Sequence, residues 1–370
     1  METKIKQKKL WPLTAALFLP ILLIGLFHIL KGNRTVMDRW VFSILASLAQ
    51  WLGRLWSVVP FSGMELIIAL FLLGNAGWIF YCVVCLARER RWKALLRRLL
   101  ALSAVWLWAL CGLCWLWNVT YYASTFTQRS GLEPEPYSVE ELALATEWFA
   151  REAARLSGQV DRDGEGHFNE SLSDCFDRGT FIYENVTSEF PCLDTESVEA
   201  KPLLCSRLQS ILGFTGMYFP FTGEANVNVD APACLVPATI AHEMAHQRMV
   251  ASELEANFVG IAACVTSEDE IFQYSGYLMG LIQLCNALYP VAPEVWYDIA
   301  GRNFTEELAT DWEDNNAYWK ALESPVEEAA EEAYDTFLKE NDQELGVRSY
   351  GACVDLLVTW LACKAEENVI

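Results

Sequence analysis

Three long runs of apolar residues occupy most of the first third of the chain. They extend from Trp11 to Leu30, from Met64 to Ala87 and from Leu99 to Tyr122, and Glu65 is the only acidic or basic residue in them. An α-helix rises 1.5 Å per residue and needs about twenty residues to cross about 30 Å of hydrocarbon. The pattern therefore predicts three transmembrane helices, at about residues 11–30, 64–87 and 99–122.

The first run has an alternative interpretation, because it follows four lysines within residues 4–9 and so resembles a cleaved signal peptide. The apolar segment of a signal peptide is usually about 7–15 residues long and ends in a cleavage site with small residues. This run is longer and is followed by Lys31. These features favour a retained transmembrane helix.

Residues 41–59, between the first two runs, alternate between apolar and polar positions. Ser43, Ser47, Gln50 and Arg54 interrupt a segment that is otherwise rich in Leu, Val and Trp. An amphipathic helix that lies in the membrane interface has this pattern. We therefore predict an interfacial helix here, with a fourth transmembrane helix as the alternative.

The rest of the chain, residues 124–370, has the pattern of a mostly helical domain with a small β element. Ser138 and Glu141 form a capping-box pattern at the start of a helix that extends to about Ser157. Residues 213–229 combine aromatic, Thr and Val residues with turn residues, which predicts strands and a hairpin. Residues 158–200 are expected to be loop with short elements. Further helices are predicted at about 236–248, 252–265, 268–288, 304–322, 325–341 and 350–363. The predicted domains are 1–123 in the membrane and 124–370 outside it.

The charges divide in the same way, with a net +10 over residues 1–123 and a net −31 over the remainder of a chain whose total is −21. The acidic part would repel phosphate groups, which argues against a nucleic-acid partner. The basic residues gather before the first run and at 88–98, and such segments stay cytoplasmic. We therefore expect a multi-pass protein of the cell membrane with a cytoplasmic N-terminus and an extracytoplasmic C-terminal domain. The lipid bilayer is then one partner.

Eight of the twelve cysteines lie in the C-terminal part. An even number in an extracytoplasmic domain permits disulfides, although their pairing cannot be deduced from the sequence. The oligomeric state also stays open.

The candidate chemistry lies in residues 237–263, where His242, Glu243 and His246 form an HExxH motif. Residues four apart on a helix share one face, so both imidazoles can reach one zinc ion. Glu243 lies beside them, where it can act as general base toward a water whose pKa the zinc lowers to about 7. The alternative is a helix face that spells HExxH by chance.

A catalytic zinc site needs a third protein ligand. Met249 and Ser252 stand where the metzincin pattern requires Gly and His, and no histidine follows His246, so a carboxylate must serve. Glu253 and Glu255 are the candidates. In an unbroken helix Glu253 would lie about 10 Å beyond His246, so the chain must turn between residues 247 and 252. Asn257, one turn after Glu253, can form a hydrogen bond with a ligating histidine and so orient its ring.

Several blocks of this sequence resemble the bacterial membrane-protein family called domain of unknown function 3810, whose members look like HExxH zinc peptidases. The blocks are Pro60-Phe61-Ser62, Trp117-Asn118, Tyr121-Tyr122, Tyr218 to Asn226, His242 to Arg248, Glu253 to Phe258, Tyr274 with Tyr277, and Gly346 to Gly351. The resemblance implies a membrane-anchored zinc metallopeptidase with a zincin-like outer domain. It also implies a gluzincin-like ligand set, with Glu253 as third ligand, Asn257 as its partner and Glu255 as the fallback. The family usually has Gly where this chain has Met249, at the expected bend.

Other residues are candidates for supporting roles. Tyr274, Tyr277, Arg348 and Tyr350 are candidate donors to the oxyanion of peptide hydrolysis, and Tyr277 is favoured because it follows the ligand helix closely. Packing is the alternative role of each. Glu224 and Asn226 are candidates for the substrate cleft, although a plain turn at Thr222-Gly223 explains them equally well. Arg348 and Tyr350 are assigned to the same candidate cleft.

The sequence thus predicts a zinc-dependent metallopeptidase that acts on a peptide or protein substrate outside the cytoplasmic membrane. One alternative is a zinc hydrolase of a cell-wall peptide or amide, and another is a non-catalytic membrane receptor or scaffold that keeps the fold. An intramembrane protease is disfavoured, because residues 241–255 are too polar for a transmembrane segment.

Overall fold

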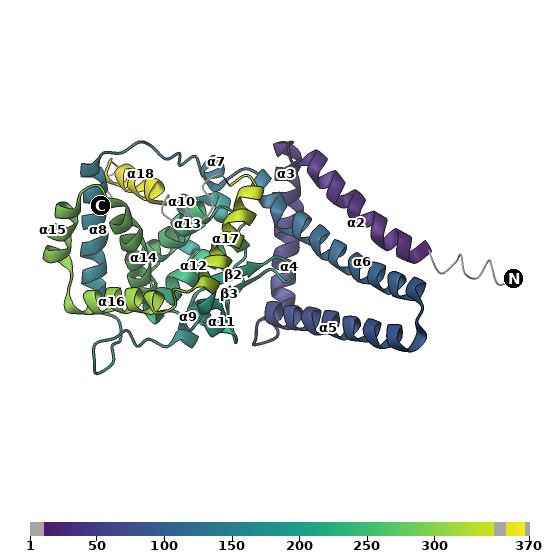
Figure 1. Cartoon of the computed structure of the whole chain (residues 1–370). Helices are drawn as coiled ribbons and strands as arrows, with labels where there is room; N and C mark the ends of the chain where they lie inside the picture. The colour runs from purple at the N-terminus through teal and green to yellow at the C-terminus, as the bar shows by residue number, and fades with distance from the viewer. Residues whose placement is uncertain (1–10, 344–352, 367–370) are drawn as a thin grey trace. The chain divides into compact units, whose positions relative to one another are not determined.

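The computed structural model describes residues 11–343 and 353–366, which divide into two compact units. The first unit comprises residues up to Leu45 together with Gly63–Ala123, and the second comprises Ala46–Ser62 together with the chain from Ser124 onward (Figure 1). The division differs in one place from the one expected from the sequence, because residues 46–62 belong with the C-terminal part.

The first unit is built from helices. They are α2 (Trp11–Leu30), α3 (Arg34–Trp40), the π-helix η1 (Val41–Leu45), α5 (Gly63–Glu89), α6 (Trp92–Leu116) and the 3₁₀ helix η2 (Asn118–Tyr122). Within the described ranges, three helical segments are long and apolar enough to cross a membrane: Pro12–Leu30, Gly63–Arg88 and Trp92–Tyr122. The three predicted helices are confirmed, and the fourth is not found. The third helix begins at Trp92, earlier than predicted. The prediction followed the apolar run, which starts only after Lys93, Arg97 and Arg98 in the first turns of this helix.

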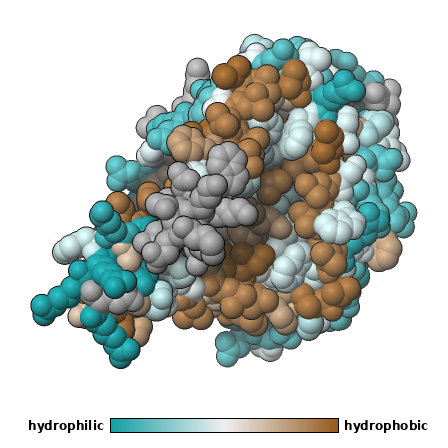
Figure 2. Space-filling view, turned by 90° about the vertical axis from the view of Figure 1, so that its right-hand side faces the viewer, coloured by the Kyte–Doolittle hydropathy of each residue, from teal (hydrophilic) through white to brown (hydrophobic). Residues whose placement is uncertain are grey.

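These three helices expose large hydrophobic side chains over much of their surface. Phe18, Leu22, Leu70, Leu73 and Phe80 are each between 60% and 70% exposed. Figure 2, which colours each residue by hydropathy, shows extended brown, hydrophobic areas on the molecular surface. Soluble proteins rarely expose contiguous apolar area on this scale, whereas a bilayer would cover it. The chain has the features of a membrane protein.

Indole groups bind polar atoms inside this apolar unit. The Trp115 indole donates to the Leu23 carbonyl oxygen at 3.0 Å, and the Trp106 indole donates to Asn75 Oδ1 at 2.8 Å. Helix α6 thereby contacts both α2 and α5. An unsatisfied polar group in hydrocarbon costs several kcal/mol, so these bonds stabilise the three-helix arrangement.

The second unit is mainly helical. Its helices are α4 (Ala46–Trp56), α7 (Phe126–Ser130), α8 (Val139–Ser157), α9 (Leu172–Arg178), α10 (Glu184–Glu189), η3 (Pro191–Leu193), α11 (Ser206–Ile211), η4 (Ala233–Leu235), α12 (Val236–Gln247), α13 (Glu253–Thr266), α14 (Glu270–Leu288), α15 (Pro293–Asn303), α16 (Glu306–Lys320), α17 (Pro325–Glu340) and α18 (Cys353–Glu366). The capping box at Ser138 and Glu141 is present at the start of α8. Helix α15 was not predicted from the sequence.

The core of this unit lies where α8, α12, α13, α14 and α18 pack together. All twelve residues of α12 are buried, so burial on every side rather than an amphipathic pattern holds this helix. A side chain at Gly260 of α13 would come within 2.8 Å of the His242 backbone nitrogen. Glycine at this position therefore lets α13 approach α12 directly behind the HExxH motif.

A three-stranded sheet lies beside α12. Strand β1 (Lys201–Pro202) pairs in parallel with β3 (Glu224–Val227), and β2 (Gly216–Phe219) pairs antiparallel with β3 in the order β1-β3-β2. Gly216 is paired with Val227 and Phe219 with Glu224, which confirms the predicted hairpin. Among the described residues β2 is therefore an edge strand.

Lys201 joins residues 46–62 to this sheet. Its ammonium group lies 2.7 Å from Glu224 Oε1 and donates to the carbonyl oxygens of Trp56 at 2.6 Å and Phe61 at 3.1 Å. Ser62 Oγ donates to Asn226 Oδ1 at 2.7 Å. The predicted helix over 41–59 exists as η1 and α4, but these polar contacts and the buried Ala49 and Gly53 hold α4 in the second unit. Its position at a membrane interface stays a prediction.

No disulfide bond joins the twelve cysteines, all of which lie in the described ranges. Cys175, Cys234, Cys264, Cys285 and Cys353 are buried among apolar side chains. Burial raises the pKa of each of these five thiols, so they act as small apolar core residues.

Candidate metal centre

Helix α12 places the two histidines of the motif on one face. His242 and His246 lie one turn apart, with ring centroids 4.9 Å apart and ring planes at 90°. Pro237 in the first turn suits a helix start, because its missing N–H would have no partner there. The HExxH segment therefore forms the helix that its spacing predicts.

The chain turns immediately after this helix. The Met249 N–H donates to the His246 carbonyl at 3.0 Å, and the Val250 N–H donates to the Ala245 carbonyl at 3.2 Å. These two bonds form a Schellman motif, whose left-handed residue is Met249 with φ of +60°. The left-handed conformation costs a non-glycine residue about 1–2 kcal/mol, which burial of the Met249 side chain offsets. The bend required between residues 247 and 252 is thus present without glycine.

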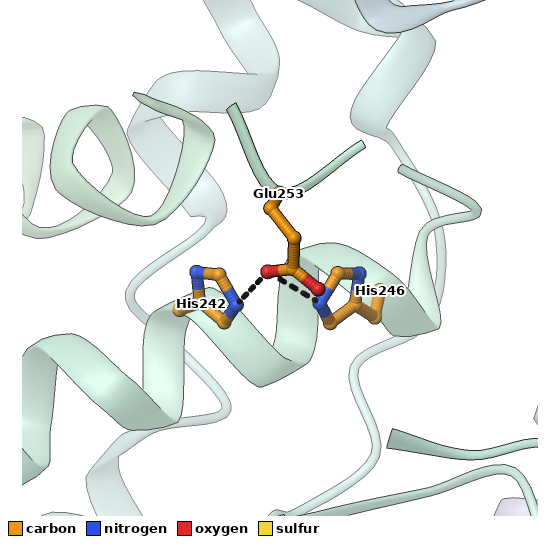
Figure 3. A group of neighbouring side chains, drawn as sticks. All are labelled: His242, His246 and Glu253. Atoms are coloured by element: carbon orange, nitrogen blue, oxygen red, sulfur yellow. Dashed lines mark ion pairs between the residues drawn. The ribbon is translucent and has the colours of Figure 1, made fainter. Parts of the chain in front are cut away.

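The turn brings Glu253, the first residue of α13, back to the histidines. Its Oε2 lies 3.2 Å from His242 Nε2 and 3.8 Å from His246 Nε2. One ligand atom from each of these residues lies within 4.8 Å of the others. Figure 3 shows the carboxylate between the two rings, with both Nε2 atoms directed toward it. All three side chains are buried, and together they could hold a metal ion.

Glu255 has a different role in the structure. Its two carboxylate oxygens accept hydrogen bonds from the backbone N–H groups of Phe126 and Thr127, both at 2.8 Å. These are the first two residues of α7, where unpaired N–H groups attract an anion. Of the two glutamates, the structure therefore brings only Glu253 to the histidines.

Burial and mutual contact shift the pKa of each side chain in the group. Burial alone would raise the pKa of Glu253, but the hydrogen bond from His242 and the electrostatic interaction with both imidazoles lower it to about 2. Burial lowers the pKa of His246 to about 4, so this imidazole is neutral. Burial also acts to lower the pKa of His242, yet contact with Glu253 raises it above its ordinary value. The Glu253 carboxylate faces both imidazoles, and the proton that it shares with His242 compensates the carboxylate charge.

Each histidine has a distinct environment at its second ring nitrogen. His246 Nδ1 lies 2.7 Å from the Val250 carbonyl oxygen, so Nδ1 carries the proton and Nε2 keeps its lone pair for a metal. His242 Nδ1 and Asn257 Nδ2 are both buried without a hydrogen-bond partner. The Asn257 side chain nevertheless raises the pKa of His242, so the two side chains are neighbours. The predicted hydrogen bond of Asn257 to a histidine is not formed in this structure.

Glu243 lies beside these ligands and against the edge of the sheet. Burial, the largest effect, raises its pKa to about 8; His242 and the Tyr218 backbone N–H act to lower it, and the Glu253 charge acts to raise it. Its Oε2 is buried without a hydrogen-bond partner. A side chain at Gly216 would come within 2.5 Å of Glu243 Oε1, so glycine is required where β2 passes this carboxyl group.

The register of the hairpin shows which backbone groups of β2 face the site. The Asn228 N–H donates to the Thr215 carbonyl at 2.9 Å, so Thr215 and Asn228 form a hydrogen-bonded pair. Such pairs alternate along an antiparallel ladder, so the backbone groups of Gly216 and Tyr218 point away from β3. These groups lie on the outer edge of the sheet, next to Glu243.

Comparison with known families identifies the chain at the family level. The model of the family described as "Protein of unknown function (DUF3810)" matches residues 41–358. The chain belongs to the DUF3810 family. No curated protein and no solved structure matches this sequence. The matched range includes α12, α13 and the whole sheet, so the His-His-Glu group lies within the DUF3810 region.

Most of the supporting residues predicted in this DUF3810 protein lie outside the group. Glu224 and Asn226 contact Lys201 and Ser62 and so bind residues 46–62 to the sheet. Tyr277 packs edge-to-face on Phe149 of α8, with ring centroids 5.2 Å apart.

Tyr274 is likewise occupied elsewhere. Its hydroxyl donates to Asp311, which also accepts two hydrogen bonds at 2.9 Å from Arg162. Arg348 and Tyr350 lie outside the described residues.

Three contacts of the DUF3810 site were missed by sequence reasoning. Tyr334 of α17 donates a hydrogen bond to Glu253 Oε1 from 81 residues away, and nothing in its local pattern distinguishes it from other tyrosines. The Tyr218 backbone contact with Glu243 depends on strand register. The glycine at 216, inside a strand pattern, was the one available signal for a close approach.

Proposed function

We propose that this DUF3810 protein is a membrane-anchored zinc metallopeptidase that hydrolyses peptide bonds outside the cytoplasmic membrane. The observation that carries the proposal is the convergence of His242, His246 and Glu253 beside Glu243 and strand β2. Two histidines and a glutamate are one of the ligand sets of catalytic zinc sites. The proposed outer domain is zincin-like, with α12 as its active-site helix.

The residues present fit such an ion. His246 offers Nε2 because its Nδ1 proton is bound to Val250, and the Glu253 carboxylate supplies the negative charge. His242 offers Nε2, while its unpartnered Nδ1 lies near Asn257. A zinc ion held there would act as a Lewis acid and make hydroxide available near neutral pH.

Glu243 is the proposed general base. Its Oε2 is free to accept a proton, and a carboxyl whose pKa lies near neutrality can both take up and release one. In peptide hydrolysis Glu243 would take the proton of the attacking water and give it to the leaving amine. Positive charge on the neighbouring ligands lowers its pKa and favours the ionised, accepting form.

The outer edge of β2 is the proposed binding site for the substrate backbone. The outward C=O and N–H groups of Gly216 can pair with an extended peptide. An extended peptide added to this edge would pass directly beside Glu243. We expect peptide or protein substrates to bind in this way.

The test uses the full-length protein in detergent, with metal content and peptide-library cleavage measured on the same preparation. Glu243→Gln should keep zinc and lose hydrolysis, whereas His246→Ala should lose both, because two ligands rarely hold catalytic zinc. Glu294→Gln, on the exposed surface of α15, is the control for loss of a carboxylate.

Three outcomes would overturn parts of the proposal. A wild-type protein that binds no zinc and cleaves nothing would be a receptor or scaffold. Zinc binding with cleavage of cell-wall amides but not of ordinary peptides would make it a hydrolase of another substrate class. Full turnover by Glu243→Gln would remove Glu243 as the base.

A further inference from the structure

A helix from far along the chain reaches the third candidate ligand. The Tyr334 hydroxyl, on α17, donates a hydrogen bond to Glu253 Oε1. The other oxygen of the same carboxylate, Oε2, faces His242 Nε2 and His246 Nε2. The two oxygens therefore have separate partners, and the tyrosine holds the one that does not face the histidines.

The aromatic ring of Tyr334 is fixed from two sides. It packs edge-to-face on Phe214 with centroids 5.6 Å apart and stacks on Phe337 with centroids 6.3 Å apart. Phe214 lies two residues before Gly216, the residue that touches Glu243. Glu327, near the start of α17, packs against Gly213 in the same loop. Helix α17 thus contacts both the carboxylate ligand and the segment that leads into the edge strand.

Helix α17 is nevertheless weakly held, because Leu338 is the only buried residue among its sixteen. In contrast, every residue of α12 is buried. In the view of Figure 1 the ribbon of α17 overlaps the region of α12 and β2, and the hydrogen bond from Tyr334 to Glu253 shows that α17 reaches the candidate metal site. A helix with so few buried apolar contacts belongs to the least stable part of a fold.

The site itself is closed in this structure. His242, Glu243, His246 and Glu253 have exposed fractions of 7%, 3%, 4% and 6%. A peptide can reach them only if an element that contacts the group moves, and α17, which contacts Glu253 through Tyr334, has one buried residue among its sixteen.

We propose that α17 is a movable cover of the metal site and that Tyr334 is a positioning residue which, when α17 is docked, orients Glu253 for the metal. This inference rests on the proposed function. The phenol fixes Oε1, so that Oε2 is presented to the same point as the two Nε2 atoms. Because coupling is reciprocal, a metal ion that gains affinity from docked α17 must stabilise the docking of α17 by the same factor.

The experiment compares wild type, Tyr334→Phe and Tyr297→Phe as full-length proteins in detergent. Tyr334→Phe removes the hydroxyl and keeps the packed ring, and Tyr297→Phe removes an exposed hydroxyl on α15. Zinc titration should show about a 10–100-fold weaker affinity for Tyr334→Phe, the range seen for residues that orient a metal ligand. Tyr297→Phe should bind as wild type.

Hydrogen exchange provides a second measurement, and its wild-type arm does not depend on how well the variant folds. In the wild type, added zinc should slow amide exchange in residues 325–340. The same addition should slow it much less in Tyr334→Phe, although α12 is protected in both. The metal-free variant should still fold, because the ring contacts are kept and only the hydrogen bond to Glu253 is lost.

The two proposals fail in different ways. The role proposed for α17 and Tyr334 is wrong if the wild type and Tyr334→Phe bind zinc equally well, or if zinc leaves amide exchange in α17 unchanged. Neither result contradicts the proposed metal site. If His246→Ala and wild type both fail to bind zinc, the metal site is wrong and the role of Tyr334 falls with it.

Discussion

The choice between Glu253 and Glu255 can be tested by exchanging each for glutamine. Glu253→Gln removes the charge that faces His242 and His246. Glu255→Gln removes the charge that accepts two backbone hydrogen bonds at the start of α7. The two variants are chemically identical and lie two residues apart, so each is the matched control of the other.

The expected size of the Glu255→Gln effect follows from its contacts. A hydrogen bond to a charged group contributes about 1.5–3 kcal/mol, and glutamine keeps one acceptor but turns its NH₂ group toward the second backbone N–H. We expect a loss of about 2–3 kcal/mol in the free energy of unfolding. For a unit of this size that lowers Tm by about 4–12 °C. Zinc affinity should remain that of the wild type.

Glu253→Gln should have the opposite signature. Removing a direct ligand must lower zinc affinity by more than the roughly 10–100-fold that is typical of residues that only hydrogen-bond a ligand. At a zinc concentration of about 100 Kd, the wild type gains about 2.7 kcal/mol, which raises Tm by about 5–10 °C. Glu253→Gln, with a Kd more than about 100-fold higher, should gain no more than about 0.4 kcal/mol.

The assay is thermal unfolding of each protein with and without zinc, together with a direct zinc titration. The zinc-dependent change in Tm is the deciding quantity, because Glu253→Gln also loses contacts with His242 and Tyr334 in the absence of metal. Equal losses of zinc affinity in both variants, or a larger loss in Glu255→Gln, would refute the assignment of Glu253.

Three further predictions concern the rest of the molecule. A reporter that is active only outside the cytoplasm, fused after Ile370, should be active, and activity of a cytoplasmic reporter there instead would reverse the proposed topology. Lys201→Met should destabilise the protein by about 3–5 kcal/mol, because Glu224 keeps a buried charge without its ammonium partner. The double variant with Glu224→Gln should recover much of this loss in thermal unfolding, and no recovery would mean that the two residues act independently. Asp314 raises the pKa of His167 through a hydrogen bond at 2.6 Å, so this contact stabilises the fold fully below about pH 6.5 and is lost as pH rises through the higher folded value. Asp314→Asn should lower the NMR titration midpoint of His167 toward 6.5, and an unchanged midpoint would contradict this cause.

The sequence alone determined the features that depend on local spacing. Apolar runs of membrane-spanning length predicted three helices, and the structure contains them at nearly the same residues. The HExxH spacing placed His242 and His246 on one helix face, because four residues make about one turn. The hairpin and most helices of the second unit were predicted for the same reason.

The tertiary structure decided every feature that depends on residues distant in sequence. Glu253 rather than Glu255 meets the histidines because the chain turns at Met249 and because the N–H groups of α7 bind Glu255. Residues 46–62 join the second unit because Lys201 and Asn226 bind them there. The contacts of Glu255, Lys201 and Asn226 leave no local pattern, since their partner groups lie more than a hundred residues away.

The same reason applies to the favoured oxyanion donor. Tyr277 was chosen for its proximity in sequence to the ligand helix, but helical phase turns it toward Phe149 of α8. Tyr334 lies 81 residues after Glu253 and is the tyrosine whose hydroxyl contacts it. Periodicity specifies which face of a helix a residue occupies, whereas only the packing of the helices specifies what that face meets.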